Sequence, residues 1–216
     1  GQAVAHRALG RAAIAFKAFD EAEQRLRSSL ELEIALGDRA AEANVLGGLS
    51  FLAYSQGRFD EALEDVEESV RIYRELGHAV GEGQALSMLC GAQVRLGELD
   101  DAEQHARKAL TLFRGVGFVA GEAMALMNLA EVFQHQSRLP EAIDGLERSL
   151  QLYRVVGDHY NIALVLDALG DFNSSLSDHV KAEEWWRQAL DLMEETGDLA
   201  GAEAVRAKLA GVAASA

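Results

Sequence analysis

The residue types best suited to chemistry in this chain are two pairs spaced four residues apart. Glu131 precedes His135, and Asp167 precedes Asp171. Residues four apart share a helix face, so the two pairs would form a divalent metal site if their faces converged. Solvated acidic helices produce the same spacing frequently, and we therefore expect no metal, no cofactor and no catalytic residue. A metal-dependent enzyme is a remote alternative; the prediction is a protein that is not an enzyme.

Other nucleophilic or phosphate-binding signals are weak. The single cysteine, Cys90, excludes an intramolecular disulfide and a multi-cysteine metal site. It lies beside a leucine that recurs through the chain, so we expect it to be buried as a small apolar residue. The 6 histidines are scattered and suggest no catalytic dyad, and there is no glycine-rich phosphate loop. The sequence therefore favours binding over catalysis.

Composition narrows the class of partner. The 216 residues are 49% hydrophobic and 25% charged, which is typical of a globular protein, and a single proline favours helices. The net charge of −15 opposes contact with a phosphate backbone, so we expect no direct nucleic-acid partner. No apolar run approaches the roughly 20 residues of a membrane span, and no secretion signal opens the chain. We expect a cytoplasmic protein with no membrane partner.

The chain repeats itself at an offset of 40 residues. Five columns of matching residue types carry the period. One is alanine without exception: Ala22, Ala62, Ala102, Ala142 and Ala182. Another is leucine throughout: Leu9, Leu49, Leu89, Leu129, Leu169 and Leu209. A period of this size indicates a solenoid in which each repeat buries its apolar face by stacking on its neighbours.

Each repeat contains two helical patterns. Leu46, Leu49 and Ala53 are spaced by three and four, which predicts a first helix that ends near Gly57 in a left-handed turn. Ser137 and Ser177 replace this glycine in later repeats, where we expect less favourable turns. Acidic residues then open the second helix, because carboxylates stabilise the positive end of a helix. Pro140 falls in a first turn, which tolerates it.

These patterns predict an all-α fold, a right-handed α-α superhelix of five helix pairs plus a C-terminal capping helix. We predict one solenoid domain over residues 1–216. Its repeats are 1–37, 38–77, 78–117, 118–157 and 158–197, followed by the capping helix at 198–212. Because the chain begins with Gly1 rather than methionine, we expect it to be a piece of a longer protein.

The columns resemble the tetratricopeptide repeat. In the second copy the residues that match its pattern are Leu46, Leu49, Ala53, Gly57, Phe59, Ala62, Val66 and Ser69. The chain departs from the family in its period, which is 40 rather than 34, and in lacking tryptophan at the first position. Repeats of this longer spacing are similar to those of bacterial multidomain signalling and transcriptional regulators, and of some eukaryotic cargo and polarity adaptors.

The resemblance implies that partners bind on the concave surface formed by the first helices. By their repeat position, twelve residues are candidates for this groove: Arg7, Arg11, Asn44, Phe51, Tyr54, Gln84, Met124, Met127, Asn128, Glu131, Asp167 and Asp171. Their polarity runs from basic through apolar to acidic, which suits a protein or peptide segment with an apolar centre and a basic end. We therefore expect a peptide-binding scaffold, the interaction or sensor segment of a bacterial regulator.

Several alternatives stay open. The same groove would also suit a small molecule in the sensor of a transcriptional regulator. Phe51 and Tyr54 have a second interpretation, in which they pack between neighbouring first helices and do not line the groove. Met124 and Met127 are expected to divide, with one in the core and the other in the groove. Trp185 is expected to be more exposed than its neighbour and to mark a second contact or a self-association surface, or else to pack on the last helix.

Overall fold

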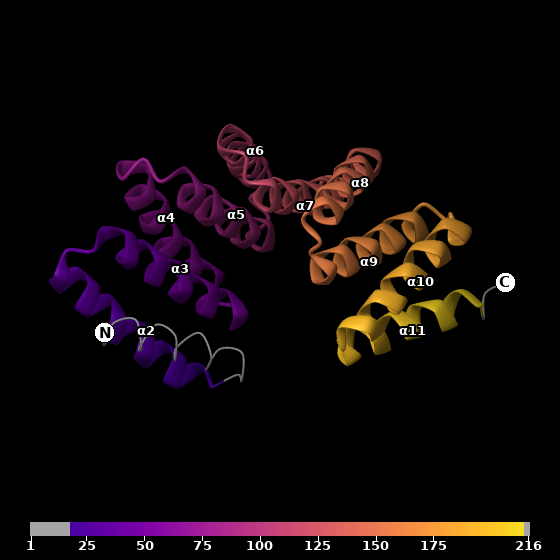
Figure 1. The fold of residues 1–216 in the computed structure, drawn as a ribbon, viewed down its shortest axis with the longest axis horizontal. Coiled ribbons are helices and arrows are strands. Elements are labelled where there is room, and N and C mark those ends of the chain that lie inside the picture. The colour runs from indigo at the N-terminus through magenta and orange to yellow at the C-terminus, as the bar shows by residue number, and fades with distance from the viewer. Residues whose placement is uncertain (1–17, 214–216) are drawn as a thin grey trace. The chain divides into compact units, whose positions relative to one another are not determined.

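The computed structural model describes residues 18–213, and all regular secondary structure in that range is helical (Figure 1). The helices are α2 (Phe19–Leu36), α3 (Arg39–Ser55), α4 (Phe59–Glu75), α5 (Ala79–Leu96), α6 (Leu99–Val116), α7 (Val119–His135), α8 (Leu139–Val156), α9 (His159–Ser175), α10 (His179–Thr196) and α11 (Leu199–Ala213). The predicted capping helix is α11. The part of the prediction that falls on residues 1–17, including the first helix of the first repeat, lies outside the described residues.

Local capping explains where several helices begin. The side chain of Asp38 accepts a hydrogen bond from the Ala41 amide at 3.0 Å, and Asp198 accepts one from the Gly201 amide at 3.0 Å. These bonds satisfy amides that have no partner inside the helix. Pro140 lies in the first turn of α8, where its missing amide hydrogen costs nothing.

The turns between helices use left-handed backbone, as predicted. Gly57 and Gly97 have φ of 76° and 83°. At the equivalent positions of the later repeats, Ser137 and Ser177 adopt φ of 61°. A side chain in this region clashes with its own backbone, so the two serines hold less favourable turns than the glycines do.

The chain divides into two compact units, with the boundary after Gly121 in the first turn of α7. In unit one each helix from α2 to α6 packs against the next, and α3 also contacts α5. Ala62 and Ala102 are fully buried, because only a small side chain allows two helices to approach closely. Ser69 donates a hydrogen bond of 2.8 Å to the carbonyl oxygen of Ala43, which joins α4 to α3.

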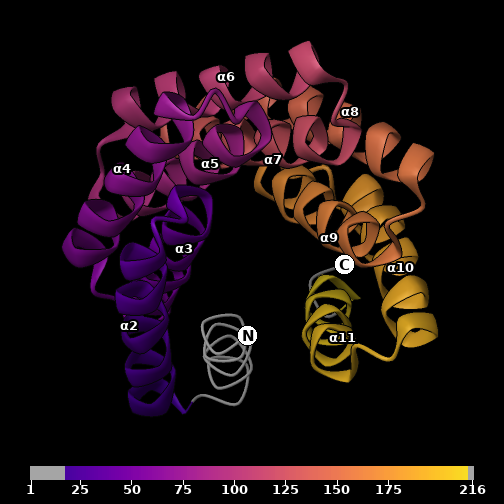
Figure 2. The same cartoon turned by 60° about the vertical axis from the view of Figure 1, so that its left-hand side comes forward.

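Unit two repeats this packing from α7 to α11. Ser149 donates to the carbonyl oxygen of Ala123 at 2.8 Å, in the same way as Ser69 in unit one. Figure 2 shows α9, α10 and α11 as successive neighbours, and the core that they share contains Ala182, Trp186 and Val205. The predicted all-helical solenoid of sequentially packed pairs is confirmed. Within residues 18–213, none of the helices combines the length and the apolar composition of a membrane span.

Candidate functional site

The first helices of two consecutive repeats, α3 and α5, present one continuous surface in unit one. We define the α3–α5 face by six residues that are spaced by three or four along these helices: Asn44, Gly47, Phe51, Gln84, Met88 and Gly91. The two rows meet, because a Cβ atom placed on Gly47 would lie 3.8 Å from the sulfur of Met88. A Cβ atom on Gly91 would meet nothing within 4 Å, so the face is open there.

This face combines an apolar contact with unused hydrogen-bonding groups. Phe51 is 51% exposed although it is a large aromatic residue. Asn44 and Gln84 are exposed, and neither amide has a hydrogen-bond partner within residues 18–213. A carboxamide offers both a donor and an acceptor, so it can pair with the backbone of an extended ligand. The face can therefore hold an apolar side chain and the peptide groups beside it.

Tyr54 belongs to the packing of unit one more than to its surface. Its ring packs edge-on against Phe59 with the ring centroids 5.4 Å apart. It also covers a core cluster that contains Ala53, Ala62 and Ala92. The packing alternative therefore describes Tyr54, which is half-buried, better than it describes the exposed Phe51.

The predicted acidic residues of α9 lie in a closed ionic cluster within unit two. We call this the α9–α11 cluster: Asp167, Asp171, Trp186 and Lys208. The Lys208 ammonium lies 2.7 Å from Asp167 Oδ1 and 2.8 Å from the Asp171 carboxylate. The indole N–H of Trp186 donates to Asp171 Oδ1 at 3.1 Å. Both carboxylates are thus already paired with groups of the chain itself.

Burial and ion pairing shift the pKa values of this cluster in opposite directions. Burial raises the pKa of the Asp167 carboxyl, and this effect exceeds the opposing hydrogen bond from Lys208. Burial would lower the pKa of Lys208, but its hydrogen bonds to Asp167 and Asp171 outweigh burial, and the pKa is raised. The ammonium therefore stays charged and holds the two carboxylates together.

A buried carboxylate with two cationic partners lies in unit one. Glu82 is 7% exposed and lies 2.9 Å from Nε of Arg74 and 2.8 Å from Nζ of Lys108. Burial alone would raise the pKa of Glu82, but its hydrogen bonds to Lys108 and Arg74 prevail, and the pKa is lowered. Glu82 joins α4, α5 and α6, so its charge supports the scaffold.

The α7 candidates occupy intermediate positions. Met124, Met127, Asn128 and Glu131 are all half-buried. The expected division between Met124 and Met127 is therefore not seen, because α7 places both at the margin of the core. Arg7 and Arg11 lie outside the described residues.

The structure also bears on the metal alternative. No group of three or more histidine, cysteine or acidic side chains within residues 18–213 is arranged to hold a metal ion. Asp167 and Asp171 do lie together, as their spacing predicts, but the ammonium of Lys208 occupies the position between their carboxylates. Cys90 is 1% exposed, which confirms the expectation that it is buried.

Two contributors were missed from the sequence, Met88 on the α3–α5 face and Lys208 in the α9–α11 cluster. Both occupy the same position of the repeat as Asn128: Met88 lies one repeat before it, and Lys208 lies two repeats after it. The 40-residue period therefore contained the signal that relates these three residues.

The fold and the surfaces of its first helices define a helical-repeat protein built from stacked helix pairs. A tetratricopeptide repeat model matches residues 40–115 and 121–195, and the chain belongs to the tetratricopeptide repeat family. No curated protein shows significant sequence similarity to the chain.

Solved structures share the fold at low sequence identity. The chain is similar to BtubC from P. vanneervenii, with 21% identity, a TM-score of 0.73, and coverage of 88% of this chain and 78% of that one. It is also similar to a Rap protein complexed with Competence and Sporulation Factor, with 14% identity, a TM-score of 0.81, and coverage of 96% and 63%. A third similar structure is a signal transduction ATPase with a tetratricopeptide repeat sensor from Pyrococcus horikoshii, with 18% identity, a TM-score of 0.75, and coverage of 97% and 33%.

Proposed function

We propose that this chain is a non-catalytic scaffold that binds a segment of a protein partner on the first helices of its repeats. The observation that carries the proposal is the α3–α5 face, which combines a half-exposed Phe51 with two exposed carboxamides that have no partner in the described part of the chain. Aromatic side chains surrounded by polar groups that pair with the partner are typical of protein-binding surfaces.

The partner segment best suited to this face is extended and apolar at its centre. Its apolar side chain would pack on Phe51 and Met88, while its peptide groups pair with Asn44 and Gln84. A basic end would add little at Asp167 and Asp171, because it would have to displace Lys208. Selectivity would therefore come from the apolar centre more than from charge.

The neighbours support a regulatory setting. One of them is described in complex with Competence and Sporulation Factor, and another carries its repeats as the sensor of a signal transduction ATPase. By analogy, we propose that this chain is the interaction or sensor segment of a bacterial regulator, and that catalytic or DNA-binding parts of such a regulator would lie elsewhere.

Selection from a phage-displayed library of random 12-residue peptides tests the proposal. Peptides selected on the unmodified protein should be rich in apolar residues, and Phe51→Ala should weaken their binding at least ten-fold in calorimetry. Ile34→Ala is the matched control, because Ile34 is a similarly exposed apolar residue, at 56%, on the second helix α2. Equal weakening by both variants, or by neither, would contradict the assignment to this face.

A screen for thermal stabilisation by metabolites separates the small-molecule alternative. A ligand that binds only the folded state raises the unfolding temperature. If a metabolite stabilises the protein and Phe51→Ala removes that effect while no peptide is selected, the face binds a small molecule and the peptide proposal fails.

A further inference from the structure

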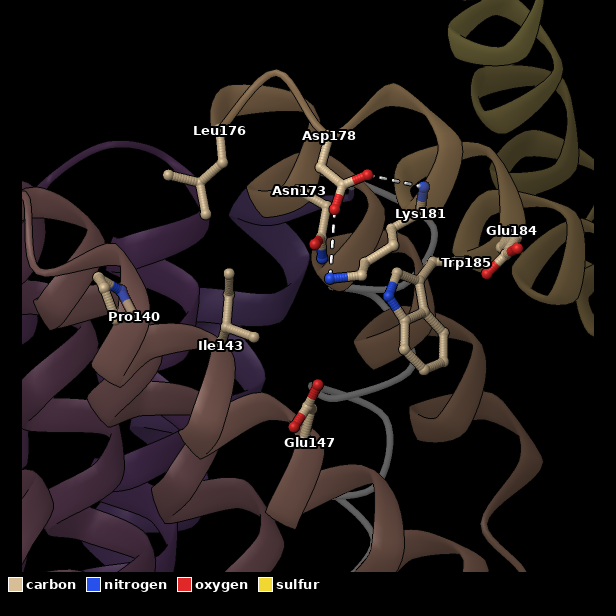
Figure 3. Close-up of a pocket in the computed structure, with 9 residues that line it drawn as sticks. All are labelled: Pro140, Ile143, Glu147, Asn173, Leu176, Asp178, Lys181, Glu184 and Trp185. Carbon is tan, nitrogen blue, oxygen red and sulfur yellow. Dashed lines mark hydrogen bonds and ion pairs between the residues drawn. The ribbon is translucent and has the colours of Figure 1, made fainter.

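A cleft in unit two lies between the second helices of two consecutive repeats, away from the first-helix residues of the proposed function. Nine residues line its volume of about 610 Å³: Pro140, Ile143, Glu147, Asn173, Leu176, Asp178, Lys181, Glu184 and Trp185 (Figure 3). This volume falls within the roughly 300–1,000 Å³ of clefts that hold small ligands or single side chains. Trp185 also lines the cleft, and its exposed surface has no role in the proposed function.

The walls of the cleft follow from helix geometry. Ile143 and Glu147 are four residues apart on α8, and Lys181 and Trp185 are four apart on α10, so each pair shares one face. Figure 3 shows the Ile143 side chain and the Trp185 indole ring on opposite sides of the cleft, with the Glu147 carboxylate directed into it from α8. An apolar wall thus faces an aromatic ring.

The two tryptophans of α10 differ sharply. Trp186 is 3% exposed, and its N–H is used by Asp171. Trp185 is only half-buried and stands in the cleft. The core therefore needs Trp186, whereas Trp185 leaves aromatic surface accessible to a ligand.

The charges of the cleft are not balanced. Lys181 is paired with Asp178, with its Nζ 3.2 Å from Oδ2, so this end is neutral. Glu147 and Glu184 are exposed, and neither carboxylate has a hydrogen-bond or ion-pair partner in the part of the chain that the structure describes. The cleft therefore carries two uncompensated negative charges beside an aromatic ring, which favours a cationic occupant.

We propose that the cleft between α8 and α10 is a second binding site, which takes an arginine side chain from a basic segment of a protein partner. The guanidinium group is planar, so it can stack on the indole of Trp185 while its N–H groups bind the carboxylate of Glu147. The aliphatic stem of the arginine then packs on Ile143 and Leu176. Glu184, beside Trp185 on α10, adds attraction for the rest of the basic segment.

Nuclear magnetic resonance titration with a blocked tripeptide that has a central arginine tests this site. The indole N–H resonance of Trp185 should shift in a saturable way, while that of the buried Trp186 serves as an internal reference. Glu147→Gln should weaken binding at least five-fold. Trp185→Leu, which lacks the indole reporter and is followed through the backbone amide resonance of Lys181, should weaken it at least as much. Glu203→Gln is the control for net charge, because Glu203 is exposed on α11 and does not line the cleft.

Each contrary result overturns the proposal in a different way. Equal weakening by Glu147→Gln and Glu203→Gln would mean general attraction to an acidic protein. A tripeptide with central leucine or lysine that binds as tightly as the arginine peptide would mean that no stacked guanidinium is recognised. A dimer in sedimentation that Trp185→Leu dissociates would assign the cleft to a second copy of the chain.

Discussion

Phe51 and Asp171 occupy the same position of the repeat, three 40-residue repeats apart, yet their surroundings are opposite. Phe51 is half exposed on the α3–α5 face, which also carries two carboxamides that have no partner within residues 18–213. Asp171 is tied to Lys208 and Trp186 in the α9–α11 cluster. The repeat position determines which surface a residue reaches, and its neighbours in space determine whether that residue is available to a ligand.

The same contrast applies to carboxylates that are wholly or partly buried. Glu82 in unit one has a lowered pKa, whereas burial leaves Asp167 in unit two with a raised pKa, although each has an ammonium partner. Two cations, Arg74 and Lys108, pair with Glu82, while Asp167 shares the single cation Lys208 with the neighbouring carboxylate of Asp171. A shared counter-ion therefore compensates for burial less completely than two separate ones do.

The largest effect should come from Gly170→Ala in α9. A Cβ atom there would lie 2.4 Å from the Trp186 ring, which is buried and held by its hydrogen bond to Asp171. Because the ring is enclosed in the core of unit two, the free energy of unfolding should fall by about 3 kcal/mol. Urea unfolding followed by circular dichroism measures this change.

Gly91→Ala is the matched variant in unit one. The new Cβ atom meets nothing within 4 Å, and alanine favours a helix over glycine, so stability should rise by about 0.5–1 kcal/mol. If both alanine variants changed stability alike, the contrast between an open face in unit one and a closed cluster in unit two would be wrong.

Lys208→Met should cost about 1–2 kcal/mol at pH 7, because it leaves two partly buried carboxylates without their shared cation. It should also raise the pKa of Asp167 further, since only the repulsion from Asp171 and the burial would remain. The cost should therefore decrease as the pH falls and Asp167 takes up a proton. Carbon-13 resonance of the carboxyl group against pH, together with urea unfolding, measures both effects.

Arg206→Met is the control on the same helix. Arg206 pairs with Glu194 on the surface, where an ion pair contributes little. A loss of stability in Arg206→Met as large as that in Lys208→Met would show that the enclosed position of Lys208 has no special effect.

Glu82→Gln should lower the free energy of unfolding of unit one by about 1 kcal/mol at pH 7, because the uncharged amide no longer forms ion pairs with Arg74 and Lys108. The loss is small because both cationic partners can turn toward solvent. The pKa of Glu82 is below its ordinary value of 4.5, so its stabilisation is present above that pH and is lost as the pH falls through the lowered pKa. The difference between the two proteins should therefore vanish in acid. A difference that persists at pH 2 would mean that the carboxylate charge is not its source.

The sign is opposite for Asp167. Its pKa is raised on folding, so the folded state holds the proton more tightly than the unfolded chain does. Acidification through this pKa therefore removes a cost, where for Glu82 it removes a stabilising interaction. Unfolding of Asp167→Asn and Glu82→Gln across the same pH series compares the two carboxylates directly.

Ser177→Gly should have a small effect, a gain of about 0.5–1 kcal/mol. Ser177 adopts φ of 61° in unit two, where glycine has no steric penalty, while the equivalent turns in unit one already use Gly57 and Gly97. The reverse change Gly97→Ser should lose a similar amount in thermal unfolding. A loss on Ser177→Gly would show that the serine side chain stabilises its turn.

Much of the fold follows from the sequence. The recurrence of alanine from Ala22 to Ala182 and of leucine from Leu9 to Leu209 predicts the helix pairs, the turns and α11. The left-handed backbone at Ser137 and Ser177 is also predicted, because these serines replace a glycine at a fixed position of the repeat. Such features depend on neighbours close in the chain or one repeat away, which a periodic pattern records.

The candidate sites were predicted less completely. The sequence allowed Phe51 and Tyr54 either to line the groove or to pack between helices. Only the packing of α3 against α5 shows that Phe51 is exposed and that Tyr54 covers the core. Lys208 pairs with Asp167 and Asp171 from about one repeat away, and nothing in the sequence pattern predicts these ion pairs.

The sequence by itself determined a stack of tetratricopeptide-like helix pairs, because a repeat that is apolar on one side is stable only against its neighbours. The tertiary structure alone decided which polar and aromatic side chains are occupied by the chain itself and which face outward. The physical reason is that ion pairs, ring contacts and clefts depend on side-chain reach between helices, and residue types at a given spacing do not specify that reach.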